Sequence, residues 1–335
     1  MHRQLKIVSL VLFLLLAQLG CAGLTTREDL RQRDRERPPG VGEVSDPKDS
    51  KAEGQIPGPG ISDPLEEPLQ PSPPAPVQMP KVGVIFGPGG FKSFAQAGVL
   101  KELERARIPI EAVVGLEWGA LVAALYAQNG QIHEVEWKLY RMEQSDLPQR
   151  GGLLRRRNDS LETLGPFLSR QFQGPNSSIE RAKIHFACPS LSLQRAGLRW
   201  QTRGGFKEAL ERCLPFPPLF RAQQPSWSAA AFALREAVEH LRQQGVNLVI
   251  LINVLSPGEL VGAESLREDW ASAILWQELR RSLAEAQSLE GVHEVIEVNT
   301  GAFPIQDFAN RRQLVSAGER AGRAAARRIA DKYGF

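Results

Sequence analysis

The sequence of 335 residues has few of the residues that build metal sites or disulfide frameworks. It contains three cysteines and five histidines, with no C-x-x-C pair and no H-E-x-x-H segment. These absences exclude the usual zinc patterns and a disulfide-dense scaffold. We therefore expect no metal site.

The sequence also lacks an excess of charge of either sign. Its 41 Lys and Arg residues nearly balance 38 Asp and Glu residues, for a formal net charge of +3. Proteins that bind nucleic acid through their phosphates usually carry a strongly basic surface. We therefore expect no nucleic-acid partner.

Long hydrophobic runs are missing as well. The apolar run Ile7–Ala17 is eleven residues, whereas a membrane-spanning helix needs roughly 20. The run follows a basic start and ends at Gln18–Cys21 (Q-L-G-C), which resembles the bacterial lipoprotein box, although Gln18 departs from the usual aliphatic residue. The resemblance implies that residues 1–20 are a lipoprotein signal peptide and that Cys21 is lipidated.

A lipidated Cys21 places the protein on a membrane of the bacterial cell envelope. By the same resemblance, Ala22 after it is compatible with sorting to the periplasmic face of the outer membrane. Two or three acyl chains anchor a protein stably, whereas one chain does not. Ordinary secretion and an uncleaved anchor stay open as alternatives.

Residues 21–80 have the composition of a tether. Half of the 24 prolines lie between Pro38 and Pro80, among Gly, Ser, Asp and Glu residues, and large apolar side chains are sparse. Such a segment cannot bury enough apolar surface to offset the entropy lost on ordering. We predict a disordered, Pro-rich tether.

Residues 81–335 have the alternating pattern of one folded α/β domain. Short apolar runs typical of buried strands alternate with helical periodicity. The pattern predicts strands at 81–87, 111–116, 183–191, 198–202, 247–254 and 292–298, and helices at 93–107, 119–128, 132–142, 228–243, 264–287 and 311–332. This order indicates a three-layer sandwich with a mainly parallel central sheet.

Two turns that follow the first two strands carry the chemistry. The first, 87–93 (G-P-G-G-F-K-S), offers backbone N–H groups at the start of a helix, where an anion or oxyanion binds. The second, 115–121 (G-L-E-W-G-A-L), resembles G-x-S-x-G, a sharp elbow that exposes its central side chain. In open α/β sheets, ligands bind at this carboxyl edge.

Together these turns resemble those of the patatin-like phospholipases. That family has a G-G-G-x-[RK]-G turn, a helix with G-V-L (here Gly98–Leu100) and then G-x-S-x-G-A. The resemblance covers most of 81–335 and implies a patatin-like fold that hydrolyses acyl esters with a Ser–Asp dyad, without a cofactor. It assigns Gly89, Gly90 and Lys92 to the oxyanion turn, and Gly115 and Gly119 to the elbow.

The sequence departs from the family at each chemical position. Glu117 stands where the family has its nucleophilic Ser. Pro88 replaces the first Gly of the oxyanion turn and removes an N–H donor, and Ser93 replaces the last. No Asp lies between Pro215 and Arg235, where the family carries D-G-G or D-G-A.

These departures predict a pseudoenzyme that binds a lipid or acyl chain in the inherited cleft, or a protein partner. One alternative is an active acyl hydrolase with a rearranged site that uses Ser93, Ser226 or Ser228. A structural envelope protein is the other. Glu117 itself is interpreted in three ways: as an acid at a helix N-terminus, as a ligand contact, or as a general base.

Two tryptophans, a run of arginines and two cysteines outside these positions can each be interpreted in two ways. Trp118 and Trp227 flank the lost catalytic positions, and either fill the former acyl pocket as core residues or line a lipid groove. The run Arg155–Arg157 is either a solvated loop or a contact to an anionic membrane. Cys188 and Cys213 either pair or stay free, because spacing alone does not bring their Cα atoms together.

Overall fold

A computed structural model of the chain describes residues 79–148, 160–222, 226–255, 270–301 and 303–335. All of them lie in a compact unit formed by residues 74–335. The predicted signal peptide, Cys21, nearly all of the tether and the run Arg155–Arg157 fall outside the described residues. They remain predictions.

The described strands form one seven-stranded sheet with the order β4-β3-β2-β1-β6-β7, and β5 pairs with β3 beside this path. Strands β3, β2, β1, β6 and β7 run parallel, whereas β4 and β5 pair antiparallel with β3. The predicted mainly parallel sheet is confirmed. The strands are β1 Val82–Phe86, β2 Ile110–Gly115, β3 His185–Ser192, β4 Leu198–Gln201, β5 Trp227–Ala229, β6 Leu248–Asn253 and β7 Glu294–Glu297.

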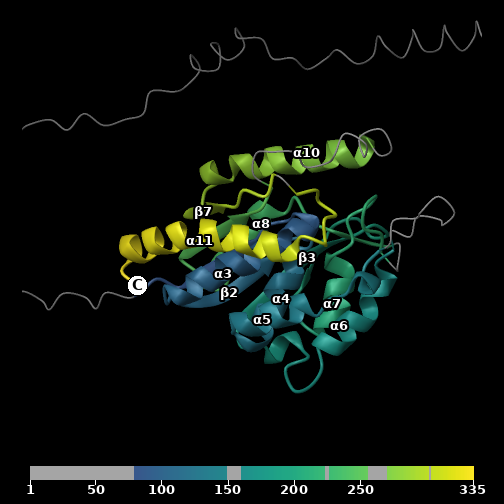
Figure 1. Ribbon diagram of the computed structural model, residues 1–335, viewed down its shortest axis with the longest axis horizontal. Helices are drawn as coiled ribbons and strands as arrows, with labels where there is room; N and C mark the ends of the chain where they lie inside the picture. The colour runs from purple at the N-terminus through teal and green to yellow at the C-terminus, as the bar shows by residue number, and fades with distance from the viewer. Residues whose placement is uncertain (1–78, 149–159, 223–225, 256–269, 302) are drawn as a thin grey trace, which may run out of the picture. The chain divides into compact units, whose positions relative to one another are not determined.

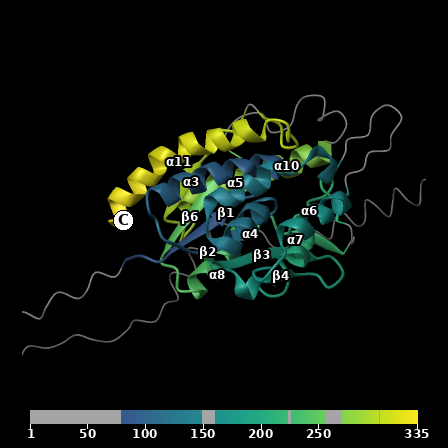
Figure 2. The ribbon, with the colours of Figure 1, turned by 60° about the horizontal axis from the view of Figure 1, so that its bottom comes forward.

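Helices cover both faces of the sheet, which completes the three layers (Figure 1). Figure 2 shows α3 and α11 on one side of the strands and α8 on the other. The α-helices are α3 Ala95–Arg105, α4 Gly119–Asn129, α5 Ile132–Tyr140, α6 Gly165–Gln171, α7 Phe206–Cys213, α8 Leu234–Gln243, α10 Trp270–Ala284 and α11 Arg311–Tyr333. Short 3-10 turns lie at Gly90–Phe94, Gln144–Asp146, Leu161–Leu164, Ile179–Arg181 and Glu285–Ser288.

The core is built around β1 and β6, whose residues are all buried. Their continuous apolar runs are what a strand with helices on both faces requires. On one face α3 packs so closely against α11 that a Cβ at Gly98 or Gly318 would collide with the backbone of the opposite helix. Only glycine fits at these two positions. Among the described helices, none combines the length and the apolar character needed to cross a bilayer.

The structure corrects three local predictions. Residues 227–229 form β5 and pair with Ser190–Ser192 of β3, so the helix predicted at 228–243 begins only at Leu234. Pairing across the sheet overrides the helix propensity of this Ala-rich segment. Residues 90–94 form a 3-10 turn before α3 begins at Ala95. Helices α6 and α7 were not predicted.

Cys188 and Cys213 form a disulfide with a Cα–Cα distance of 6.2 Å. The bond joins β3 to the last residue of α7 across a sequence separation of 25. Of the two alternatives that the sequence left open, the structure therefore has the paired one.

Candidate functional site

The two predicted turns lie side by side because their strands are neighbours. Phe86 of β1 stands opposite Gly115 of β2 in the parallel register. The Leu116 N–H donates to the Phe86 carbonyl at 2.9 Å, and a Cβ at Gly119 would collide with that same carbonyl. Only glycine therefore lets α4 begin so close to the end of β1.

The second turn has the backbone geometry of an elbow. Glu117 has φ +52°, in the left-handed region that non-glycine residues rarely adopt. The Ala120 N–H donates to the Glu117 carbonyl at 2.9 Å as α4 begins. At Gly115, a Cβ would collide with the backbone of Ala120. The two glycines of the motif thus permit a strained residue between strand and helix, as in a nucleophile elbow.

The Glu117 carboxylate occupies the first turn. Its Oε2 accepts hydrogen bonds from the Gly89 N–H at 3.0 Å and the Gly90 N–H at 2.9 Å. These are two of the donors that the resemblance assigns to an oxyanion. The side chain at the nucleophile position therefore takes the place that the oxygen of an ester would need.

This carboxylate is fully buried and only partly satisfied. Glu117 is 0% exposed, and its Oε1 has no hydrogen-bond partner among the described residues. Burial raises the pKa of Glu117 to about 7, because desolvation disfavours its charged form more than the backbone N–H groups of Trp118, Gly89 and Gly90 favour it. The acid thus changes charge near neutral pH.

Packing fixes the two donors. A Cβ at Gly89 would collide with the Val254 side chain after β6, and one at Gly90 would lie 2.5 Å from the Ile305 side chain. Gly90 also has φ +55°. The Phe91 N–H donates to the Ile305 carbonyl at 2.9 Å. The turn is therefore held rigidly by the loops that follow β6 and β7.

Lys92, assigned to the oxyanion turn, contacts one of these loops. Its Nζ donates to the Thr300 carbonyl at 2.9 Å, and the Thr300 hydroxyl donates to the Val254 carbonyl at 2.6 Å. Lys92 is 0% exposed. Burial, with a smaller contribution from the positive charge of Arg280, lowers the pKa of Lys92 to about 8. Lys92 ties the turn to the loop after β7.

Aromatic rings fill the space beside Glu117. The Trp118 ring lies 4.7 Å from the Phe91 ring and 5.2 Å from the Phe220 ring, measured between centroids. All three side chains are buried. Of the two interpretations of Trp118, the structure has the core residue. Trp227 lies elsewhere, on β5, with the Arg212 guanidinium 5.1 Å from the centre of its ring.

The three candidate serines have no catalytic partner among the described residues. Ser93 Oγ is buried and unpaired. Ser228 Oγ donates to the Pro215 carbonyl at 3.4 Å, and Ser226 has no described side-chain bond. A serine nucleophile needs a base within hydrogen-bond reach. In the described part of the chain, none of these hydroxyls bonds to a carboxylate or a histidine.

Two more buried polar atoms, one in the first turn of α3 and one in the elbow, have no partner among the described residues. They are Gln96 Oε1 and Trp118 Nε1, which join Ser93 Oγ and Glu117 Oε1. Buried polar atoms without partners are uncommon in native proteins and often mark a functional site. The described residues contain no group of three or more His, Cys, Asp or Glu side chains suited to a metal ion.

Sequence reasoning found both turns but missed what encloses them. Thr300 and Ile305 come from a segment more than 150 residues away from both turns and carry no motif, whereas Phe220 lies in a Pro- and Phe-rich region, 215–220, that belongs to the family resemblance. The direction of the Glu117 side chain was also not predicted. An acid in the turn after one strand, beside backbone N–H donors in the turn after the adjacent strand, is the signal from which that contact could have been inferred.

Comparison with known proteins supports the resemblance. Residues 84–224 match the family model described as patatin-like phospholipase. A segment of 51 residues is 43% identical to lysophospholipase nte1 of Aspergillus niger and of Aspergillus oryzae. This segment is 15% of the chain and spans only 3% of the length of either relative.

Among solved structures, VipD from Legionella pneumophila aligns with a TM-score of 0.42 and 14% identity, over 76% of this chain and 67% of that one. The family model, and not this structural likeness, shows that residues 84–224 belong to a patatin-like phospholipase domain. Its fold class is the one that the sequence predicted.

Proposed function

We propose that the patatin-like domain of this chain is a pseudoenzyme that binds a lipid, an acyl chain or a protein partner and does not hydrolyse esters. One observation carries the proposal: the Glu117 carboxylate is bound by the Gly89 and Gly90 N–H groups. A patatin-like domain supports a role in lipid chemistry in general. The proposal that the domain no longer hydrolyses esters goes beyond this general role and rests on Glu117.

Ester hydrolysis requires a nucleophile, a base and free oxyanion donors. Here the nucleophile position holds a carboxylate, which attacks an ester poorly, and two oxyanion donors are already bonded. Hydrogen bonds to charged groups contribute about 1.5–3 kcal/mol each. Displacing the charged form of Glu117 from both donors therefore costs about 3–6 kcal/mol before any ester carbonyl is polarised, and displacing its neutral form costs less.

A ligand role is favoured over a purely structural one by the four unpartnered polar atoms in and directly after the two turns. A domain that had become a simple scaffold would gain from replacing them with apolar groups, since each unsatisfied buried group costs about 1–3 kcal/mol.

The proposal includes a membrane anchor. A lipidated Cys21 and the tether at 21–80 would hold the domain at the periplasmic face of the outer membrane of a bacterial cell envelope. The disulfide between Cys188 and Cys213 supports an oxidising compartment.

Turnover assays of the purified full chain test the main claim. Short-chain and long-chain acyl esters and a phospholipid would be offered to the chain and to its Ser93→Ala, Ser228→Ala and Glu117→Ala variants. We expect rates equal to those of buffer in all four proteins. Turnover that disappears in one variant would instead establish an active hydrolase with a rearranged site.

Restoring the alcohol is the complementary experiment. Glu117→Ser would release the Gly89 and Gly90 donors and return the family nucleophile. We still expect no efficient hydrolysis, because the segment of β5 has no Asp to act as base. Efficient turnover by this single variant would contradict the loss of the second catalytic residue.

Native mass spectrometry separates the binding modes. A lipid that remains bound to the purified chain supports a filled cleft. A lipid-free chain that associates with a second protein supports a partner.

A further inference from the structure

A positively charged hollow lies where the end of α3 meets the second half of α11. It has a volume of about 490 Å³ and is lined by Glu102, Arg105, Ala106, Arg323, Ala326 and Arg327. The helices approach closely because Gly98, Gly318 and Gly322 have no side chain at their contact. This close approach brings the arginines of both helices to one place.

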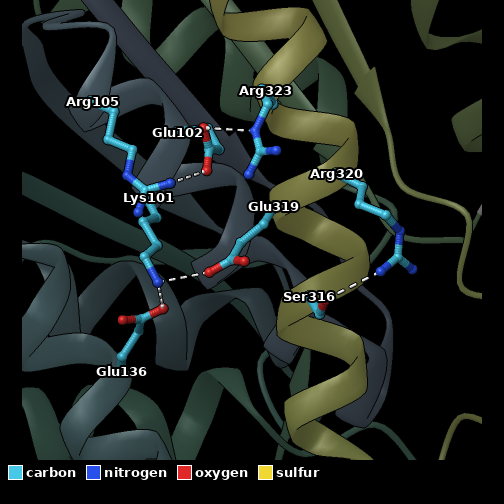
Figure 3. A network of polar contacts seen from close by, with 8 residues as sticks. All are labelled: Lys101, Glu102, Arg105, Glu136, Ser316, Glu319, Arg320 and Arg323. Carbon is cyan, nitrogen blue, oxygen red and sulfur yellow. Dashed lines mark hydrogen bonds and ion pairs between the residues drawn. The ribbon is translucent and has the colours of Figure 1, made fainter.

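A buried carboxylate holds two of these arginines next to each other (Figure 3). Glu102 Oε1 accepts from Arg105 at 2.6 Å, and Glu102 Oε2 lies 3.7 Å from Arg323 Nε. The Glu102 side chain is 6% exposed, whereas each arginine side chain is 57% exposed. The carboxylate thus fixes two guanidinium groups whose other N–H donors still face the solvent.

The third arginine has no ion-pair or hydrogen-bond partner among the described residues. Arg327 lies one helical turn beyond Arg323 on the same face of α11 and is exposed. Three arginines against one glutamate leave two unbalanced positive charges in the lining. The C-terminal dipole of α3 opposes them with only about half a negative charge.

The neighbouring cation on α3 adds no free charge to the hollow. One turn earlier, Lys101 is already balanced by Glu136 at 3.0 Å and Glu319 at 2.7 Å. In Figure 3, Arg320 points away from Glu102, to the far side of α11, and it bonds to Ser316 at 3.1 Å. The same helix therefore carries an exposed arginine inside the hollow and another outside it.

We propose that this hollow binds a phosphate group with two negative charges. Arginine suits such a group because its planar fork donates two parallel hydrogen bonds to phosphate oxygens. The phosphate monoester of an anionic lipid headgroup and free inorganic phosphate share this chemistry. The site lies on the outer surface of α3 and α11 and does not depend on the state of Glu117.

Two binding arms distinguish the sources. In the first, the full chain is titrated calorimetrically with inorganic phosphate. In the second, it is sedimented with vesicles of phosphatidylcholine in which one lipid in five is phosphatidic acid, and with vesicles of phosphatidylcholine alone. Binding in the first arm identifies free phosphate as a ligand. Binding only to the phosphatidic acid vesicles identifies a lipid headgroup.

Arg327→Gln is the test variant and Arg320→Gln is its matched control. Both remove one exposed arginine from α11, but only Arg327 lines the hollow. We expect Arg327→Gln to weaken binding about fivefold, as for one Arg at an anionic surface, and Arg320→Gln to leave it unchanged. Neither residue has an ion-pair partner in the described chain, so both variants should fold.

Arg323→Lys tests the fork itself, because it keeps the charge near Glu102 and loses the planar donors. We expect weaker binding with an unchanged melting temperature. Equal losses in Arg327→Gln and Arg320→Gln, or no binding of the unaltered chain in either arm, would overturn the proposal.

Discussion

At the scale of single residues, Glu117 decides the chemistry of the site. Its side chain carries a carboxylate from the elbow to the two N–H donors of the neighbouring turn. The strained backbone at φ +52° is kept, although the alcohol that such strain serves in hydrolases is gone. The backbone of Glu117 therefore keeps the geometry of a nucleophile elbow, while its side chain occupies the two oxyanion donors.

The raised pKa of Glu117 predicts a pH-dependent stability. Because its pKa is about 7 in the folded protein, against 4.5 for the free side chain, the folded state holds this proton more tightly than the unfolded state. Stability is therefore lost as the pH rises from about 4.5 to about 7, and the loss is complete above that. The shift corresponds to about 3 kcal/mol.

Glu117→Gln removes this titration and keeps an oxygen for the two donors. Chemical denaturation at pH 5 and pH 8 would compare the free energies of unfolding of the two proteins. We expect the variant to gain about 2.5 kcal/mol relative to the unaltered chain between these pH values. A difference that does not change with pH would show that Glu117 titrates normally.

The residue scale also shows the limit of sequence reasoning. The motif located Gly89, Gly90 and Glu117 correctly as neighbours, because glycine positions and strand order follow local rules. Lys92 belongs to the same motif, yet it bonds to Thr300, more than two hundred residues away in the chain. The sequence around Lys92 does not predict this contact, because only the tertiary fold places Thr300 beside it.

At the scale of elements, the close packing of α3 and α11 depends on small residues. In an open helix position, Gly→Ala stabilises by about 1 kcal/mol. At Gly318, however, the new Cβ would collide with the Ala95 carbonyl. We predict that Gly318→Ala destabilises the domain by about 2 kcal/mol and lowers its melting temperature by roughly 4–8 °C.

Gly165→Ala, at the start of α6, is the control, because its Cβ would meet no atom within 4 Å. It should leave the melting temperature unchanged or raise it slightly. Thermal unfolding followed by circular dichroism gives both values. A Gly318→Ala protein as stable as the control would show that the helices can separate without cost.

The disulfide predicts a second effect at this scale. It closes a loop of 25 residues between β3 and α7, and in the chain-entropy model such a link stabilises by about 3 kcal/mol. Reduction with dithiothreitol should lower the denaturation midpoint of the unaltered chain. The Cys188→Ser/Cys213→Ser double variant should not respond to the reductant, and a response in that variant would assign the effect to another cause.

Elements with continuous apolar character were predicted well, and those set by tertiary pairing were not. Strands β1, β2 and β6 consist largely of apolar residues, so their own sequences predict that they are buried. The Ala-rich segment before α8 favours a helix by composition, but Trp227–Ala229 pairs with β3. Helices α6 and α7 are seven and eight residues long, too short for a helical period to stand out.

At the scale of the whole molecule, we predict that a signal peptide, residues 1–20, and a tether, residues 21–80, precede the domain. The anchor is a prediction from the residues around Cys21. In a bacterial expression host, the full chain should incorporate labelled palmitate and sediment with membranes. Cys21→Ser should abolish the labelling, and labelling that persists would place the lipid elsewhere.

The central claim is that the hydrolytic machinery is gone although the fold that held it remains. Its most direct test is covalent labelling of the purified full chain with a fluorophosphonate probe, followed by peptide mapping by mass spectrometry. We predict no adduct on Ser93, Ser226 or Ser228, because none of these three hydroxyls bonds to a carboxylate or a histidine in the described part of the chain and because Glu117 occupies the anion site. A stoichiometric adduct on Ser93, Ser226 or Ser228 would contradict it.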